Sequence, residues 1–193
     1  MRELVYFVAV SLDGRIASPD GAFDAFPTSG DHFAMIIADW ADTLPAPALA
    51  ALGVEPDGSR FDTVLMGWNT YAVGLPGLTE PYPHLTQIVF SRTRTADDVG
   101  PSVRRTDRDP IDVVRELKSQ HGGDIWLCGG GVLAAAQLPE IDRLVPKVNP
   151  VVLGDGKPLF DGAGYSPTDF ALTHSTAYAS GVVVGDYRRS RSR

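Results

Sequence analysis

The sequence predicts an α/β domain in three layers, in which helices cover a mixed, mostly parallel sheet with antiparallel C-terminal strands. Two observations lead to this fold class. Short apolar runs rich in Val, Ile and aromatic residues alternate with amphipathic segments along most of the chain, as in strand–helix–strand units. Beyond Pro139 three strand-like runs follow one another without a helical segment between them, which is typical of antiparallel pairing.

The first apolar run, 4–10, is continuous and is expected to be a buried central strand. A loop over 11–17 and a turn at 18–21 are expected to follow it. Ser29 is expected to cap a helix over about 31–40, because its hydroxyl can accept from free backbone N–H groups. The fold therefore begins with a central strand, a long connection and one helix.

The rest of the chain supplies the other strands and two further helices. Residues 43–59 are rich in Pro, Ala and Gly and are expected to form an excursion with one short helical piece. Asp109 is expected to cap a helix over 110–120, and another helix should follow the glycines after residue 128. Further strands are expected at 63–66, 87–90, 125–128, 144–148, 170–176 and 182–187.

Length and composition limit the classes of function. A chain of 193 residues can bury roughly 70% of its unfolded surface in one domain, which we expect over residues 1–188, before a basic tail at 189–193. The net charge of −7 argues against a nucleic-acid partner. No apolar run is long enough for a membrane span, and the N-terminus does not have the pattern of a signal peptide. The histidines lack metal-ligand spacing, and the single cysteine fits a reducing compartment. A cytoplasmic protein without a metal or membrane partner is expected.

The segment Cys128-Gly129-Gly130-Gly131 joins an apolar strand to a strong helix former. Glycine lets a backbone approach a phosphate closely, and a helix start offers free N–H groups, although triple glycines also form plain tight turns. Cys128 has two interpretations, a thiolate nucleophile or a small packing residue, and no base lies near it in the sequence.

Two other polar loops also follow buried strands, namely Gly67 to Tyr71 and Ser91 to Thr93. In an open α/β sheet ligands bind at the carboxyl ends of the strands, where such loops converge. Hydroxyl groups, a guanidinium and backbone amides are the groups that hold a pyrophosphate and a ribose phosphate. The three loops together therefore predict a dinucleotide site at this edge of the sheet.

Five segments, at 11–17, 64–71, 88–93, 125–131 and 150–160, form an ordered set of motifs. Together they resemble the dihydrofolate-reductase-like superfamily, and more closely the reductase domain of riboflavin-biosynthesis deaminase–reductases (RibD C-terminal type) and its stand-alone relatives. The resemblance extends from Leu4 to Tyr187. It implies a dihydrofolate-reductase-like fold, NADPH as hydride donor and a homodimer.

The resemblance also implies the residues that contact the cofactor. They are Ala9 and Ile16 beside the nicotinamide, Gly67, Trp68, Asn69 and Thr70 over the pyrophosphate, Ser91 and Arg92 at the adenosine ribose and its 2′-phosphate, and Gly129, Gly130, Gly131, Val132 and Leu133 around the phosphates. The implied activity is reduction of a small heterocycle, such as a ribosylaminopyrimidine or a pteridine. The alternative is a non-catalytic nucleotide-binding or regulatory protein on the same fold.

Trp68 departs from the family, which usually has an arginine at this position. Indole carries no charge, although it can stack on a flat ring. Either Arg92 or Arg94 replaces the missing charge, or the cofactor preference differs. A packed aromatic beneath the neighbouring loop is the structural alternative.

Three residues are candidates for catalysis. Asp13 lies in the loop beside the expected nicotinamide position, where an Asp-Gly turn is the structural alternative. Asp31 stands near the position of the pterin-binding acid of dihydrofolate reductases, but can equally be a helix-start residue favoured by the dipole. Lys147 faces the same side of its strand as Val145 and Asn149. It can bind an anionic or carbonyl-bearing substrate, or discourage aggregation from an edge strand.

Overall fold

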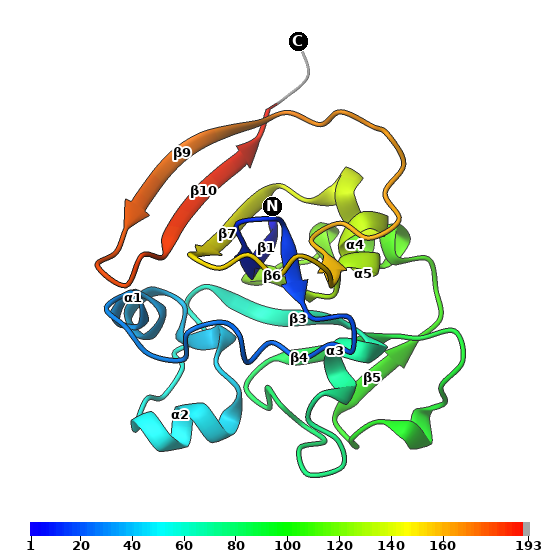
Figure 1. Ribbon diagram of the computed structural model, residues 1–193. Coiled ribbons are helices and arrows are strands. Elements are labelled where there is room, and N and C mark those ends of the chain that lie inside the picture. Colours follow the sequence, from blue (N-terminus) through cyan, green and yellow to red (C-terminus); the bar gives the residue numbers. More distant parts are fainter. Residues whose placement is uncertain (191–193) are drawn as a thin grey trace.

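The computed structural model describes residues 1–190 of the chain. Its main sheet contains β1 (Leu4–Ser11), β3 (Phe61–Gly67), β4 (Thr86–Phe90), β5 (Val103–Thr106), β6 (Asp124–Gly129), β7 (Arg143–Asn149), β9 (Phe170–Ala177) and β10 (Val183–Arg189). The eight strands lie in the order β5-β4-β3-β6-β1-β7-β10-β9 (Figure 1). The strands from β5 to β7 in this order are parallel, and β10 runs antiparallel to both of its neighbours. The predicted α/β fold with a mostly parallel sheet is confirmed.

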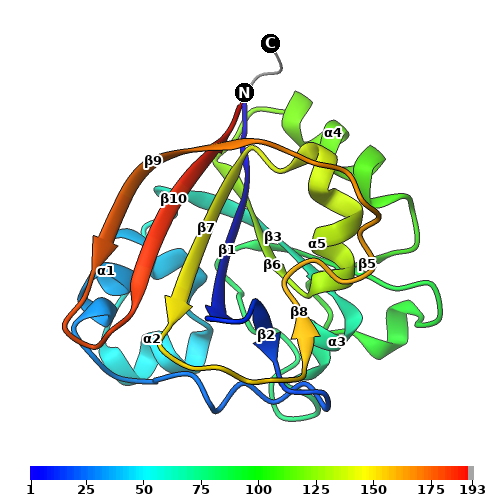
Figure 2. The same cartoon turned by 45° about the horizontal axis from the view of Figure 1, so that its top comes forward.

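Helices cover both faces of this sheet. They are α1 (His32–Asp39), α2 (Ala46–Leu52), α3 (Trp68–Ala72), α4 (Pro110–Ser119) and α5 (Gly131–Gln137). A two-stranded sheet of β2 (Arg15–Ala17) and β8 (Lys157–Pro158) lies beside the carboxyl end of β1, on the side of α5 (Figure 2). Three short 3-10 turns occupy Ala41–Thr43, Ala96–Asp98 and Leu138–Glu140. None of the helices within residues 1–190 combines the length and apolarity needed to cross a bilayer.

The central strand β1 contributes to a core on each face. Tyr6 packs with Val114 and Leu127 on the side of α4 and α5. Phe7 packs with Trp40 and Trp126 on the side of α1. Because both faces are covered by helices, β1 is apolar at consecutive positions instead of alternating with polar residues. This explains why the run 4–10 correctly predicted a buried central strand.

The start of α1 differs from the prediction. Gly30 adopts a φ of +139°, so the chain turns between Ser29 and the helix, and Asp31 occupies the N-cap position. The Asp31 carboxylate does not cap the helix. It accepts hydrogen bonds from the backbone N–H groups of Ala179 at 2.7 Å and Ser180 at 3.0 Å, in the connection between β9 and β10. The expected Ser29 cap is therefore wrong, and Asp31 fastens α1 to the last two strands.

The strands that the sequence analysis does not predict are short and have little apolar pattern. β2 lies within the expected loop 11–17, β8 has two residues, and β5 has the sequence Val-Arg-Arg-Thr. At the other end, β10 extends through Arg189, which donates to the carbonyl of Ile141 at 2.7 Å. The expected basic tail thus begins within a strand, and its residues 191–193 lie outside the described part of the chain.

Gly131 marks the closest approach between α5 and β8. A Cβ built at Gly131 would lie 2.1 Å from the carbonyl oxygen of Pro158. The substitution Gly131→Ala must therefore separate the two segments, and we expect it to lower the free energy of unfolding by about 1–3 kcal/mol. Urea denaturation measures this change. Gly164→Ala is the control, because its Cβ meets open space; similar stabilities for the two variants would contradict the account.

Candidate functional site

The three polar loops begin side by side at one edge of the main sheet. In the parallel ladder Gly67 at the end of β3 pairs with Phe90 at the end of β4, and Met66 pairs with Gly129 at the end of β6. The segments that follow these strands therefore leave the sheet together. Their predicted convergence is what the topology produces.

The glycines at these strand ends lie close to one another. A Cβ at Gly67 would lie 3.6 Å from the carbonyl oxygen of Gly129 and 3.7 Å from the nitrogen of Gly130. A Cβ at Gly130 would meet Thr70 Oγ1 at 3.4 Å and Ile16 Cδ1 at 3.8 Å. Gly129 has a φ of +134°, which favours glycine, and its peptide bond to Gly130 is cis. We call Gly67, Thr70, Gly129 and Gly130 the glycine cradle.

The cradle presents polar groups that other described residues leave unused. The Thr70 hydroxyl forms no hydrogen bond within residues 1–190, and Asn69 beside it is exposed. A backbone without side chains next to a free hydroxyl suits the phosphates of a dinucleotide. Val132 is 66% exposed, whereas Leu133 is buried in the core, so Leu133 can contribute only its backbone to a ligand.

Lys147 lies next to the expected nicotinamide position. Its partner across the ladder is Ala9 of β1, and its Nζ lies 3.5 Å from the centroid of the Phe7 ring. β7 is paired on both sides, so the interpretation of Lys147 as an edge-strand lysine is wrong. The structure places it on the face covered by α1, at the carboxyl end of the central strands.

The Lys147 ammonium is poorly solvated and has no partner. It forms neither a hydrogen bond nor an ion pair with another residue of the described range 1–190. Burial lowers its pKa to about 7, while the neighbouring Cys128 opposes this shift. At neutral pH Lys147 therefore holds its proton weakly, which suits a group that binds or protonates a ligand.

Cys128 is a packing residue. Burial raises the pKa of its thiol to about 12, so the thiol is protonated at neutral pH. It packs against the core on the α1 side that contains Phe7. The thiolate interpretation has no support from this environment.

Asp13 connects two loops at the mouth of the site. Its Oδ1 accepts from the Ser11 hydroxyl at 2.6 Å and from the Leu153 N–H at 3.0 Å, and its Oδ2 accepts from the Gly154 N–H at 2.8 Å. These bonds lower its pKa to about 2. Asp13 is therefore a carboxylate at neutral pH, which positions the loops after β1 and β7 and is poorly suited to donate a proton.

Asp31 is similarly occupied by structural bonds. Its hydrogen bonds with the backbone N–H groups of Ser180 and Ala179 lower its pKa. The adjacent His32 is buried, and its Nδ1 lies 3.0 Å from the Ser180 hydroxyl oxygen. The contacts of Asp31 explain its presence without a role in proton transfer.

The loop after β4 lies over the start of α3. Trp68 packs in the core beside Tyr71, at 5.7 Å between ring centroids, so the packing interpretation holds for one side of the indole. The Trp68 indole also contacts Arg94, whose guanidinium carbon lies 4.6 Å from the ring centroid. The Ser91 hydroxyl oxygen accepts from the backbone of Arg94 at 3.1 Å, and Arg92 is exposed.

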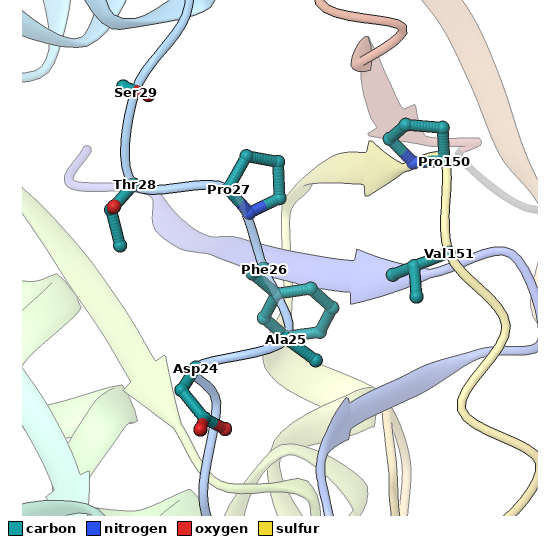
Figure 3. A pocket seen from close by; sticks show the side chains of 8 residues that line it. All are labelled: Asp24, Ala25, Phe26, Pro27, Thr28, Ser29, Pro150 and Val151. Carbon is teal, nitrogen blue, oxygen red and sulfur yellow. The ribbon is translucent and has the colours of Figure 1, made fainter.

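An open cavity of about 450 Å³ adjoins this edge of the sheet. Figure 3 shows the segment 24–29 facing Pro150 and Val151 across the cavity. Val151 also accepts a hydrogen bond from the Leu12 N–H at 2.8 Å, so the cavity borders the loop after β1. These lining residues were not predicted, because a Pro- and Gly-containing connection carries no pattern beyond that of a loop. No cluster of potential metal ligands occurs within residues 1–190.

Comparisons with known proteins agree with this architecture. Residues 2–184 match the family described as the RibD C-terminal domain. The chain is 31% identical over 165 residues to the uncharacterized protein YwjB of Bacillus subtilis (strain 168), covering 82% of this chain and 83% of that protein. This similarity extends over most of both proteins.

Two solved structures show the same fold. One is a diaminohydroxyphosphoribosylaminopyrimidine deaminase/5-amino-6-(5-phosphoribosylamino)uracil reductase of Thermotoga maritima, with a TM-score of 0.68 and 16% identity over 98% of this chain and 57% of that one. The other is the dihydrofolate reductase of Enterococcus faecalis complexed with NADP(H), with a TM-score of 0.65 and 15% identity over 98% and 97% of the two chains. With the family match, these likenesses confirm the resemblance seen in the sequence: the chain belongs to the RibD C-terminal domain family and has the dihydrofolate-reductase-like fold.

Proposed function

We propose that the protein is an NADPH-dependent reductase that transfers a hydride to a small heterocyclic substrate of the ribosylaminopyrimidine or pteridine type. The observation that carries this proposal is the pairing of Ala9 with Lys147, at the same edge of the sheet as the glycine cradle. The glycine cradle, which suits a dinucleotide, and Lys147, a cation that can face a substrate, are thus at the same edge of the sheet.

The strand order gives the dinucleotide a direction along the edge. Ala9 belongs to β1, the cradle to β6 and β3, and Ser91 and Arg92 follow β4, so the implied nicotinamide, phosphate and adenosine positions come in sequence. Neighbouring strands are about 4.8 Å apart, so these four strands span about 14 Å. NADPH bound in this way would supply the hydride, and the protein would supply binding and orientation.

The position of Lys147 suits a substrate with a polar atom. Phe7 and Trp40 stack in the core with their centroids 4.1 Å apart, and the Lys147 ammonium lies over the Phe7 ring. Its ammonium can donate a hydrogen bond, and then its proton, to the heteroatom on which charge develops as a C=O or C=N bond is reduced. A pKa of about 7 lets it do so near neutral pH.

The loops after β1 and β7 complete the site by limiting the access of water. Asp13 holds them together by accepting two hydrogen bonds, from the backbone N–H groups of Leu153 and Gly154. The Leu159 N–H also donates to the Gly14 carbonyl at 3.0 Å, which fixes β8 against the same loop. This arrangement holds Ile16, beside the cradle, in a defined position.

The proposal is tested by binding and turnover with the intact chain. We expect NADPH to raise the melting temperature, and candidate pterins or ribosylaminopyrimidines to oxidise it. Lys147→Met should lower turnover by about 10²- to 10⁴-fold, because a proton donor is lost, while NADPH affinity changes less than about threefold. Thermal shift without turnover on any candidate would favour the alternative of a nucleotide-binding protein. Absence of any shift would contradict the proposal at its first step.

The pH dependence of stability tests the environment of Lys147 independently of activity. Burial lowers its pKa from 10.5 to about 7, so between these values the unfolded chain binds more protons and stability rises with pH. Lys147→Met removes this dependence. By calorimetry, we expect the melting temperature of the variant to exceed that of the wild type by several degrees near pH 7, and the difference to shrink towards pH 10. A difference that stays constant over this range would show that Lys147 titrates normally.

A further inference from the structure

The Trp68–Arg94 pair brings a cation to the edge of the glycine cradle. Gly67, which belongs to the cradle, is followed directly by Trp68, and Arg94 reaches the indole from the loop after β4. The guanidinium carbon lies 4.6 Å from the ring centroid, within the range of a cation–π interaction. The pair thus places a positive charge beside residue 68, although the side chain at that position is uncharged.

The backbone around Arg94 is held in place. The Ser91 hydroxyl oxygen accepts from the N–H groups of Thr93 at 3.4 Å and Arg94 at 3.1 Å. The N–H of the next residue, Thr95, donates to Asp98 Oδ2 at 2.7 Å. These bonds and the indole fix both ends of the Arg94 side chain, so less conformational entropy is lost when it binds a ligand.

The donors of the Arg94 guanidinium are nevertheless available. Among the hydrogen bonds of the described residues none uses the Arg94 side chain, and its ion pair with Asp98 is 3.8 Å long. The side chain is 47% exposed. A phosphate, whose oxygens match the planar fork of a guanidinium, would compete well with such a loose pair.

We propose that Arg94, seated on Trp68, is the residue that recognises the 2′-phosphate on the adenosine ribose of the dinucleotide. The inference rests on the proposed use of NADPH and names the determinant of its preference over NADH. Arg94 follows β4 and contacts Trp68, which follows β3, and both strands lie on the side of β6 away from β1 and Ala9. Arg92, in the same loop, is exposed and has no comparable aromatic platform in the described structure, so ordering its side chain costs more.

The test compares the binding of NADPH and NADH by titration calorimetry of the intact protein. We expect Arg94→Ala to weaken NADPH binding by about 10- to 100-fold and NADH binding by less than about twofold, since a charge-assisted pair with the 2′-phosphate is lost. Arg92→Ala should have a smaller effect on NADPH. Arg104→Ala, which removes an exposed arginine of β5, is the charge-matched control and should leave both affinities unchanged.

A double variant tests by a gain of binding whether a cation at this position sets the preference for NADPH. Trp68→Arg combined with Arg94→Ala moves the cation to residue 68 and should restore at least a tenfold preference for NADPH over NADH. Equal losses for both cofactors in Arg94→Ala, or wild-type affinities, would overturn the inference while leaving the reductase proposal intact. If the wild type binds neither cofactor, the proposed function fails together with the inference.

Discussion

The whole site depends on the backbone contact between the ends of β3 and β6. Met66 pairs with Gly129 in the parallel ladder, so Gly67 and the Gly129–Gly130 segment lie close together, and the φ of +134° at Gly129 favours glycine there. Two consequences follow from this contact. Thr70 and Ile16 come to face the same stretch of backbone, and the first residue of α3 lies beside the loop after β4. A residue with a side chain in place of Gly129 would have to adopt a strained backbone, which would disturb the groups that a dinucleotide needs together.

A second constraint comes from the burial of charge beside this cradle. Lys147 is placed by its register with Ala9, and the aromatic ring of Phe7 beneath its ammonium replaces part of the lost hydration. The other two candidate catalytic residues, Asp13 and Asp31, instead accept hydrogen bonds from backbone N–H groups of distant loops. Of the three candidate catalytic residues, Asp13 and Asp31 thus hold loops in place, whereas Lys147 forms no hydrogen bond or ion pair within residues 1–190.

The sequence predicted the parts of the fold that rest on local pattern. The apolar run of β1 and the Asp109 cap of α4 are both as expected, because periodicity and capping act over a few residues. The strands β5 and β8, and the partners of Asp31, depend on pairing between distant segments and could not be predicted locally. The same holds at the site: Trp68 was recognisable as a departure, whereas the stacking of Arg94 on its indole required the structure.

A crystal structure of the protein with NADP⁺ tests the central claim most directly. We expect the dinucleotide to lie across the carboxyl ends of β4, β3, β6 and β1, with its pyrophosphate against Thr70 and Gly130. The nicotinamide should lie beside Ala9, with Lys147 facing the space where a substrate would bind. Density for the dinucleotide at any other surface, or with its nicotinamide end over β4, would contradict the account.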